Sequence, residues 1–524
     1  MRRISKGRKR DTNTHVNLDT VTDILSYKKD LSLVFDPKKL NVESRIGRIF
    51  LIIGPHESDP SKPSLLFVYP CHEFPYCQST FSRITQFCYP DGMKKASSSD
   101  SFLVNQFVFG LNEENGLLFG ICTHFTLKPK PHFLSAISDS TLFCMCVITP
   151  IPQLSAHFQF QSFLIGLLLD HESEVPMIDP ERYVSSTQML DDISVEPRYF
   201  NDSEARLSGF IPPLHPHEEN QLFAAINTIY IPKVFLFSVE IYMGLKIDLS
   251  MSNTYRLSES IHMQVSTPKD SMKEIAMVCF DVLFSSLDVQ DIVRYFRALI
   301  TEQRVLIVSE NINILSYCVL AGLALVHPMT FKGAILPILP NDPDFLEYID
   351  TPVPYVFGAL STQLLSQIVI SPDITMINID TKKVYYPDDM PHMPNAGELR
   401  KQLKDLLTSL DVVSPSTNDV NFWMKRRQNA LPIHIKRKSR LKYSFLPSDT
   451  ERIFRVFRQF TEPLVNSDRL AGCRVRDTTD PDNPAIGFVK EVYMITVRPE
   501  DVEFIEMFVS TQTFQGYCEE TFFA

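Results

Sequence analysis

The chain has 524 residues, a net charge of −11, and hydrophobic and aromatic contents of 44% and 11%. A chain of this length predicts about three domains, and this apolar content excludes a disordered scaffold because it is sufficient for buried cores. The net negative charge excludes a general electrostatic attraction to nucleic acid or to anionic lipid, so we predict no nucleic-acid partner.

The ten cysteines are scattered and include no Cys-x-x-Cys pair. Cys71, His72, Cys77 and Cys88 are neighbours in sequence, but their spacing matches no zinc pattern, so we predict no metal and no cofactor. The chain opens without a secretory signal, and its longest apolar runs, residues 163–169 and 318–326, are too short to span a membrane. We therefore expect reduced thiols and a cytoplasmic protein that contacts endomembranes only peripherally.

The N-terminal part predicts a basic, flexible tail over residues 1–44 and an α/β unit over residues 45–169. Two apolar strands are followed by a helix that ends at the turn sequence Tyr-Pro-Asp-Gly, residues 89–92. Three further strands, the first two joined by a hairpin turn, and an apolar helix complete the order β-β-α-β-β-β-α.

Residues 218–412 predict a second α/β unit, and residues 291–359 show its pattern most clearly. An amphipathic helix is followed by a strand at 305–308, a helix over about 312–326 and a strand at 334–339. His327–Pro328 ends the second helix because proline cannot donate a backbone hydrogen bond. This alternation predicts a parallel sheet covered by helices. Further strands are expected near 234–239, 246–249, 375–380 and 383–386, and a helix near 396–410.

Two linkers of opposite charge flank this unit, and an all-α segment is expected over residues 448–524. Residues 170–217 form an acidic linker or insertion, and residues 413–447 form a basic linker. Three interpretations stay open: the two linkers bind each other and cover a functional surface, the basic linker and residues 1–10 bind anionic membrane, or both linkers are independent solvated loops. The basic candidates are Lys425, Arg426, Arg427, Lys436, Arg437, Lys438 and Arg440.

No catalytic motif is visible in the sequence. The phosphate-binding GxxxxGK[ST] and GxGxxG patterns, the HExxH zinc motif and the GxSxG nucleophile motif are all absent. Glu302 and Arg304 flank the start of a predicted strand, where an ion pair or a helix cap is a simpler interpretation than catalysis. The sequence thus favours a protein that acts by binding rather than an enzyme with covalent chemistry.

Three ordered blocks of sequence resemble the tripartite DENN domain. The upstream block is carried by Phe-Cys-Tyr-Pro-Asp-Gly at 87–92 and Gly-Leu-Leu-Phe-Gly at 116–120. The central block is carried by ALITEQRVLIVS at 298–309, by the segments HPMTF and ILPILP that follow, and by DTPVPYVFGA at 350–359. The downstream block is carried by FVSTQTFQGYCEE at 508–520.

The resemblance implies a longin-like N-terminal lobe, a central α/β lobe and a helical extension. It also implies a guanine nucleotide exchange factor for a Rab-family small GTPase, which binds across both lobes and promotes GDP release by preferring the nucleotide-free GTPase. We expect the motif residues to be core and exposed neighbours to contact the GTPase. These candidates are Tyr89, Asp91, Glu302, Arg304, Asp350, Thr351, Pro354, Asp380 and Lys382.

Two alternatives stay within the same fold. A trafficking adaptor would bind a GTPase without exchange activity. A longin–DENN GTPase-activating protein would require an arginine finger after the last strand of the first lobe, and residues 131–181 contain neither Arg nor Lys.

Overall fold

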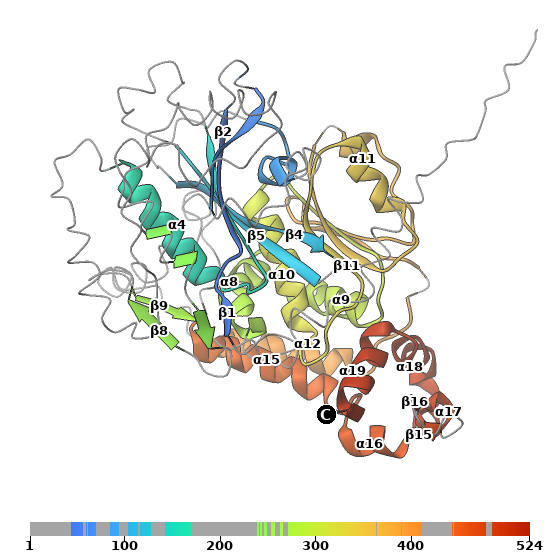
Figure 1. Ribbon diagram of the computed structural model, residues 1–524. Coiled ribbons are helices and arrows are strands. Elements are labelled where there is room, and N and C mark those ends of the chain that lie inside the picture. The colour runs from blue at the N-terminus through green and yellow to red at the C-terminus, as the bar shows by residue number, and fades with distance from the viewer. Residues whose placement is uncertain are drawn as a thin grey trace, which may run out of the picture.

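The fold consists of two α/β lobes, each built on a five-stranded sheet, and a mainly helical C-terminal extension (Figure 1). The mixed α/β class expected from the sequence is confirmed. This description rests on a computed structural model, and the residues that the structure describes are 43–55, 59, 61–69, 84–93, 103–113, 116–126, 142–169, 238–239, 242–243, 246–248, 253–256, 262–265, 271–362, 364–388, 390–410, 443, 445–477 and 485–523.

The N-terminal lobe is an antiparallel sheet with the strand order β3-β2-β6-β5-β4. Two of the three inner strands, β2 and β6, are buried along their whole length, as expected for strands covered on both faces. Helix α4 packs on β5, and helical residues 84–88 precede β4, which reproduces the predicted order. The bounds are β2 (Ile49–Pro55), β3 (Pro63–Tyr69), β4 (Leu103–Glu113), β5 (Gly116–Phe125), β6 (Phe143–Thr149) and α4 (Leu154–Leu169).

The central lobe is a sheet with the order β11-β12-β10-β13-β14, in which only β14 is antiparallel to its neighbour. The apolar helix α10 packs on α8 and on β10, β11 and β12. The strands and short helices of the central lobe are β10 (Val305–Ser309), β11 (Ala334–Leu339), α11 (Pro343–Leu346), η6 (Glu347–Asp350), β12 (Tyr355–Leu360), η7 (Leu365–Gln367), β13 (Thr375–Asn378) and β14 (Lys383–Tyr385). Its longer helices are α8 (Ser271–Ser286), α9 (Val289–Ile300), α10 (Ile312–Leu325) and α12 (Ala396–Ser409).

The C-terminal extension begins with α15, which packs on α8 and α12. It is mainly helical, but it also contains the antiparallel hairpin β15–β16, which the all-α expectation did not include. Its elements are α15 (Pro447–Thr461), α16 (Ser467–Gly472), β15 (Arg474–Asp477), β16 (Ala485–Phe488), α17 (Lys490–Met494), η8 (Pro499–Asp501), α18 (Val502–Val509) and α19 (Gln512–Phe523).

Two short strand pairs lie outside the main sheets. Strand β1 (Glu43–Arg45) pairs with β7 (Lys246–Asp248), and β8 (Asn253–Arg256) pairs with β9 (His262–Val265). The prediction of a strand near 234–239 is wrong for the two residues of that range that the structure describes, because Ser238 and Val239 are helical. Tyr242 and Met243 are helical as well. Tyr242 stacks on Phe160 of α4, with 3.7 Å between ring centroids, so packing against α4 explains the helix there.

No helix in the described ranges is long and apolar enough to cross a membrane. The acidic linker and the basic residues from Lys425 to Arg440 lie outside the described residues.

Two histidines are buried in the N-terminal lobe and held in their neutral form. His124 lies with Nε2 2.7 Å from the carbonyl of Cys88, and the amide Nδ2 of Asn105 lies 3.3 Å from its Nδ1. His157 lies with Nε2 3.2 Å from the carbonyl of Ile151 and Nδ1 2.7 Å from the hydroxyl of Tyr242. Burial lowers the pKa of each imidazole from 6.5 to about 4.

We predict that the free energy of unfolding falls as the pH is lowered from 7 to 5. Below pH 6.5 the two imidazoles bind protons in the unfolded chain but not in the folded chain, and this favours unfolding. Their contribution to the free energy of unfolding is therefore full above pH 6.5 and is lost as the pH falls toward 4. Each histidine accounts for about 2 kcal/mol at pH 5. Urea unfolding at both pH values tests this: His157→Gln should reduce the difference, whereas substitution of the exposed His392 by Gln should not. An unchanged difference in His157→Gln would contradict the assignment.

Candidate functional site

The predicted contact residues of the central lobe lie at opposite edges of its sheet. Strands β10, β12 and β13 are parallel, so residues that precede them share one edge and residues that follow them share the other. We call these the amino edge and the carboxyl edge. The amino edge contains Glu302, Arg304, Asp350, Thr351 and Pro354, and the carboxyl edge contains Asp380 and Lys382.

Glu302 caps a helix of the C-terminal extension. Its carboxylate accepts hydrogen bonds from the backbone N–H groups of Gln512 and Thr513, at 2.9 and 2.7 Å, and from the Thr513 hydroxyl at 2.6 Å. These donors lie at the start of α19, where a carboxylate satisfies the unpaired N–H groups and interacts favourably with the helix dipole. Glu302 is therefore a helix cap, the simpler of the interpretations that the sequence offered.

Arg304 holds the loop before β12 to the sheet. Its guanidinium pairs with Asp373 and donates a 3.2 Å hydrogen bond to the carbonyl of Thr351, and only 16% of the side chain is exposed. The backbone of Pro354 accepts a 2.9 Å hydrogen bond from Ala334 at the start of β11. These amino-edge residues organise the sheet, whereas the side chain of Asp350 is exposed.

The carboxyl edge is built from polar residues that follow each parallel strand. Asp380, after β13, accepts hydrogen bonds from the Ser309 hydroxyl at 2.9 Å and from the Glu310 N–H at 2.6 Å. Asn311 caps α10 by accepting from two N–H groups of its first turn. In open α/β sheets this is the edge where ligands and partners bind, because loops and helix N-termini converge there.

The carboxyl edge also joins the N-terminal lobe. Asn341, which follows β11, donates from its N–H to the carbonyl of Pro90 at 2.6 Å and from its amide to Asp91 at 3.0 Å. The amide oxygen of Asn341 accepts a 2.8 Å hydrogen bond from Thr362, which follows β12. Asp91 therefore lies beside the carboxyl edge, and one face of the molecule contains residues from both lobes.

A second set of contacts joins the lobes beneath this edge. The N–H groups of Gln106 and Val108 on β4 donate to side chains of α10, namely Asn313 Oδ1 at 2.7 Å and Ser316 Oγ at 3.4 Å. Asn313 also donates from Nδ2 to Asn105 at 3.1 Å. Asn313 and Ser316 are not among the residues predicted from the sequence, although polar residues on so apolar a helix are a signal of such contacts, because buried polar groups require partners.

Tyr89 was expected to be exposed, and that expectation is wrong. Only 4% of the residue is exposed, and its hydroxyl donates to the carbonyls of Ile53 and Leu142, at 3.0 and 3.2 Å. Tyrosine has an apolar ring and a polar hydroxyl, so a tyrosine next to a turn is compatible with either an exposed or a buried position. Here the ring stacks on that of His124, with 5.1 Å between centroids, and fills the space between the turn and the sheet.

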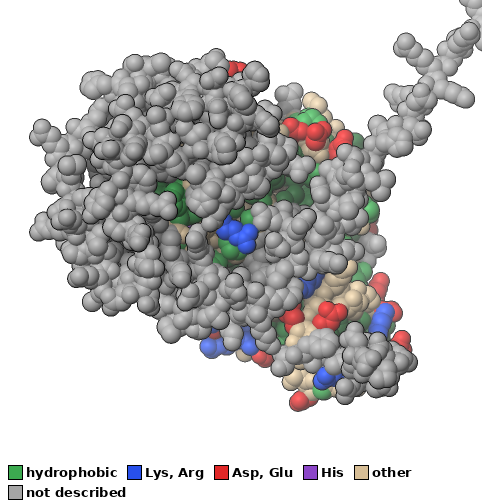
Figure 2. Space-filling view, viewed as in Figure 1, with side chains coloured by type: hydrophobic (Ala, Val, Ile, Leu, Met, Phe, Trp, Pro, Cys, Tyr) green, Lys and Arg blue, Asp and Glu red, His purple; other side chains and the backbone are tan. Residues whose placement is uncertain are grey.

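Acidic side chains gather near the carboxyl edge. In the space-filling view, Asp and Glu side chains lie at the end of the molecule where α11 is found (Figure 2). Asp344 and Glu347 are exposed there, and Glu310 and Asp380 are exposed at the neighbouring strand ends. Lys382 is exposed in the turn between β13 and β14, with a left-handed φ of 53°. The arrangement is a polar, mainly acidic surface.

The two-lobed α/β fold with a helical extension is the arrangement that the motif resemblance implied. The family model described as the DENN (AEX-3) domain matches residues 248–382. The chain therefore contains a DENN domain, and the resemblance seen in its motifs is confirmed.

Proteins whose sequences are similar to this chain are named as DENN domain-containing proteins. Human DENN domain-containing protein 1A is 28% identical over 131 residues, which are 24% of this chain and 13% of that protein. Human DENN domain-containing protein 2A is 36% identical over 101 residues, which are 19% of this chain and 10% of that protein. DENN domain-containing protein 1A of Xenopus laevis is 19% identical over 338 residues, which are 63% of this chain and 26% of that protein.

We predict that Glu302→Gln weakens the attachment of α19 without unfolding the lobes. A neutral amide accepts weaker hydrogen bonds than a carboxylate, so we expect a loss of about 1 kcal/mol. The readout is hydrogen exchange at the amides of Gln512 and Thr513, which should become about fivefold faster, a change that corresponds to about 1 kcal/mol. Glu503→Gln, at an exposed position on α18, is the matched control. Equal exchange in both variants would remove Glu302 as the cap.

Proposed function

We propose that this chain is a guanine nucleotide exchange factor for a Rab-family small GTPase in membrane trafficking. The observation that supports it most strongly is the DENN domain over residues 248–382, which contains the parallel strands of the central sheet and both of its edges. Exchange requires no covalent chemistry, because the factor acts by binding the nucleotide-free GTPase more tightly than the GDP-bound one. A preference of about 10⁴-fold requires about 5.5 kcal/mol of differential binding, which a few well-packed interface residues can supply.

We place the GTPase contact at the carboxyl edge and the adjoining turn of the N-terminal lobe. Support comes from the hydrogen bonds between Asn341 and residues 90–91, which bring both lobes onto one face. Asp91, Asp380 and Lys382 are the sequence candidates on this face, and the exposed Glu310 joins them. At the amino edge, Glu302, Arg304 and Thr351 already bind other parts of the chain, which leaves Asp350 as the exposed candidate there.

A GDP-release screen tests the proposal. The chain is added to a complete panel of Rab-family GTPases loaded with a fluorescent GDP analogue, and we expect release to accelerate for at least one of them. Lys382→Gln should reduce the exchange efficiency about fivefold, equivalent to about 1 kcal/mol of interface energy. Lys404→Gln, at an exposed position on α12, is the control and should match the wild type.

The screen also separates exchange from an adaptor role. Binding to a GTPase without accelerated release would support a DENN-fold adaptor and overturn the exchange activity. Neither binding nor release across the panel would overturn both. Equal exchange by Lys382→Gln and Lys404→Gln would remove Lys382 from the contact.

We also propose that the protein is cytoplasmic and contacts anionic endomembrane through the basic segment of residues 425–440. Each Lys or Arg near an anionic surface contributes about 1 kcal/mol of attraction. A chain with Lys436, Arg437, Lys438 and Arg440 changed to Gln should bind less to phosphatidylserine vesicles in co-sedimentation, and the wild-type binding should weaken with salt. Equal sedimentation of the two chains would count against membrane contact.

A further inference from the structure

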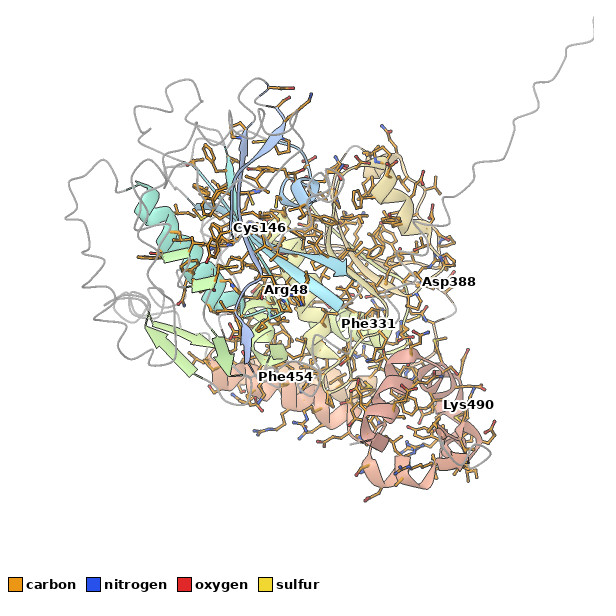
Figure 3. All side chains as sticks on the ribbon, in the orientation of Figure 1. Arg48, Cys146, Phe331, Asp388, Phe454 and Lys490 are labelled. Carbon is orange, nitrogen blue, oxygen red and sulfur yellow. The ribbon has the colours of Figure 1, made fainter. Side chains whose placement is uncertain are left out.

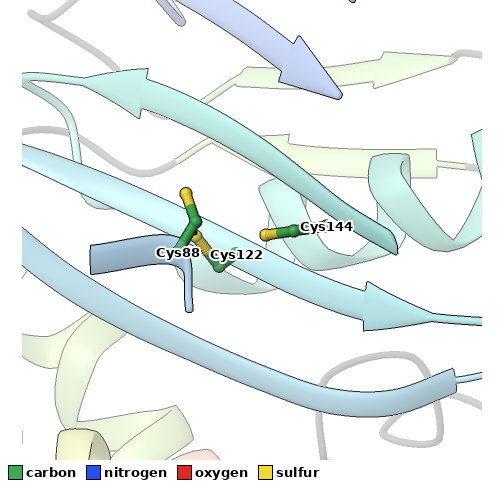
Figure 4. Close-up of side chains that lie close together, drawn as sticks. All are labelled: Cys88, Cys122 and Cys144. Carbon is green, nitrogen blue, oxygen red and sulfur yellow. The ribbon is translucent and has the colours of Figure 1, made fainter. Parts of the chain in front are cut away.

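Three thiols from separate elements meet in the core of the N-terminal lobe. Cys88 ends the short helix before the 89–92 turn, Cys122 lies on β5 and Cys144 lies on β6. Their sulfur atoms all lie within 4.8 Å of one another, and Figure 4 shows the three side chains next to each other, with the Cys144 sulfur directed toward Cys122. We call this group the thiol cluster. All three residues are fully buried.

One sulfur–sulfur distance in the thiol cluster matches that of a metal–thiolate centre, and the other two lie within 4.8 Å. The sulfur atoms of Cys88 and Cys122 are 3.8 Å apart. Tetrahedral Zn²⁺ with Zn–S bonds of about 2.3 Å places its sulfur ligands about 3.8 Å apart. An ion at the centre of the three thiols therefore requires small side-chain adjustments rather than movement of the strands.

Cys146 lies near the thiol cluster but is not part of it. It follows Cys144 by two residues on β6, so both side chains are on the same face of the strand, and it pairs in register with Cys122. Figure 3 places it within the N-terminal sheet.

The grouping distinguishes these three thiols from the other buried cysteines. Cys279, Cys318, Cys473 and Cys518 are buried as well, yet among the described residues only Cys88, Cys122 and Cys144 form a group of possible ligands at metal-binding distances. The backbone around Cys88 is also held in place, because His124 Nε2 lies 2.7 Å from its carbonyl oxygen and the Tyr89 hydroxyl is bound to two carbonyls. Such contacts orient the ligands of a metal site.

We propose that Cys88, Cys122 and Cys144 bind one thiophilic metal ion, Zn²⁺ or Cu⁺, through their three sulfur atoms. Each ligand loses its S–H proton to solvent as the sulfur–metal bond forms, and nothing is oxidised or reduced. The ion links the helix before the 89–92 turn to β5 and β6. It thereby stabilises Pro90 and Asp91, which bind Asn341 at the junction of the lobes.

The test uses the full-length chain, prepared under reducing, oxygen-free conditions. The metal content of the isolated chain is measured by mass spectrometry, and the chain freed of metal is titrated with Zn²⁺, with Cu⁺ and with Co²⁺ as a spectroscopic substitute for Zn²⁺. We expect one ion per chain, sulfur-to-Co²⁺ charge-transfer absorption that Zn²⁺ abolishes, and a rise in the unfolding temperature on loading. Saturation by Cu⁺ but not by Zn²⁺ would assign the ion as Cu⁺.

Two substitutions and one chemical measurement control the test. Cys122→Ala should abolish stoichiometric binding and the thermal shift, whereas Cys279→Ala, a buried thiol outside the cluster, should retain both. If Cys122→Ala fails to fold, alkylation of the wild type decides: loading should slow modification of Cys88, Cys122 and Cys144 at least tenfold relative to Cys279. A wild-type chain that binds none of the three ions stoichiometrically, binding retained in a folded Cys122→Ala, or equal alkylation of all four thiols would overturn the proposal.

Discussion

The architecture depends on how α10 of the central lobe closes the edge of the N-terminal sheet. Strand β4 pairs on one side only, with β5, and an open edge would leave a row of unpaired N–H groups. Side chains of α10 act as the acceptors that a neighbouring strand would provide, because Asn313 and Ser316 accept hydrogen bonds from the backbone N–H groups of Gln106 and Val108. The same helix packs on β10, β11 and β12, so one element orients both sheets.

This orientation gives the two edges of the central sheet different roles. The amino edge is attached to the C-terminal extension, since Glu302 caps α19 and Lys332 pairs with Glu520 of that helix at 3.2 Å. The carboxyl edge adjoins the turn at residues 90–91 and leaves exposed polar side chains beside the N-terminal lobe. The most recognisable motif residues therefore build the scaffold, whereas the loops after the strands carry exposed polar side chains.

The helix before the 89–92 turn connects the core of the N-terminal lobe to this face. Cys88 contributes its thiol to the thiol cluster and its carbonyl to the contact with His124, and His124 in turn lies beside Asn105, a partner of Asn313. The polar contacts thus run from the buried core to α10 and the lobe junction.

The sequence by itself determined the fold class, the β10–α10–β11 alternation and the DENN resemblance, because periodicity and ordered motifs are local properties of the chain. Tertiary structure alone decided that Glu302 reaches a helix 210 positions away, that Tyr89 is buried, and that the thiols of Cys88, Cys122 and Cys144 meet. It also decided which candidates share a face. The reason is physical: hydrogen-bond partners, burial and metal-binding geometry depend on how distant elements pack, and no local pattern of residues specifies that packing.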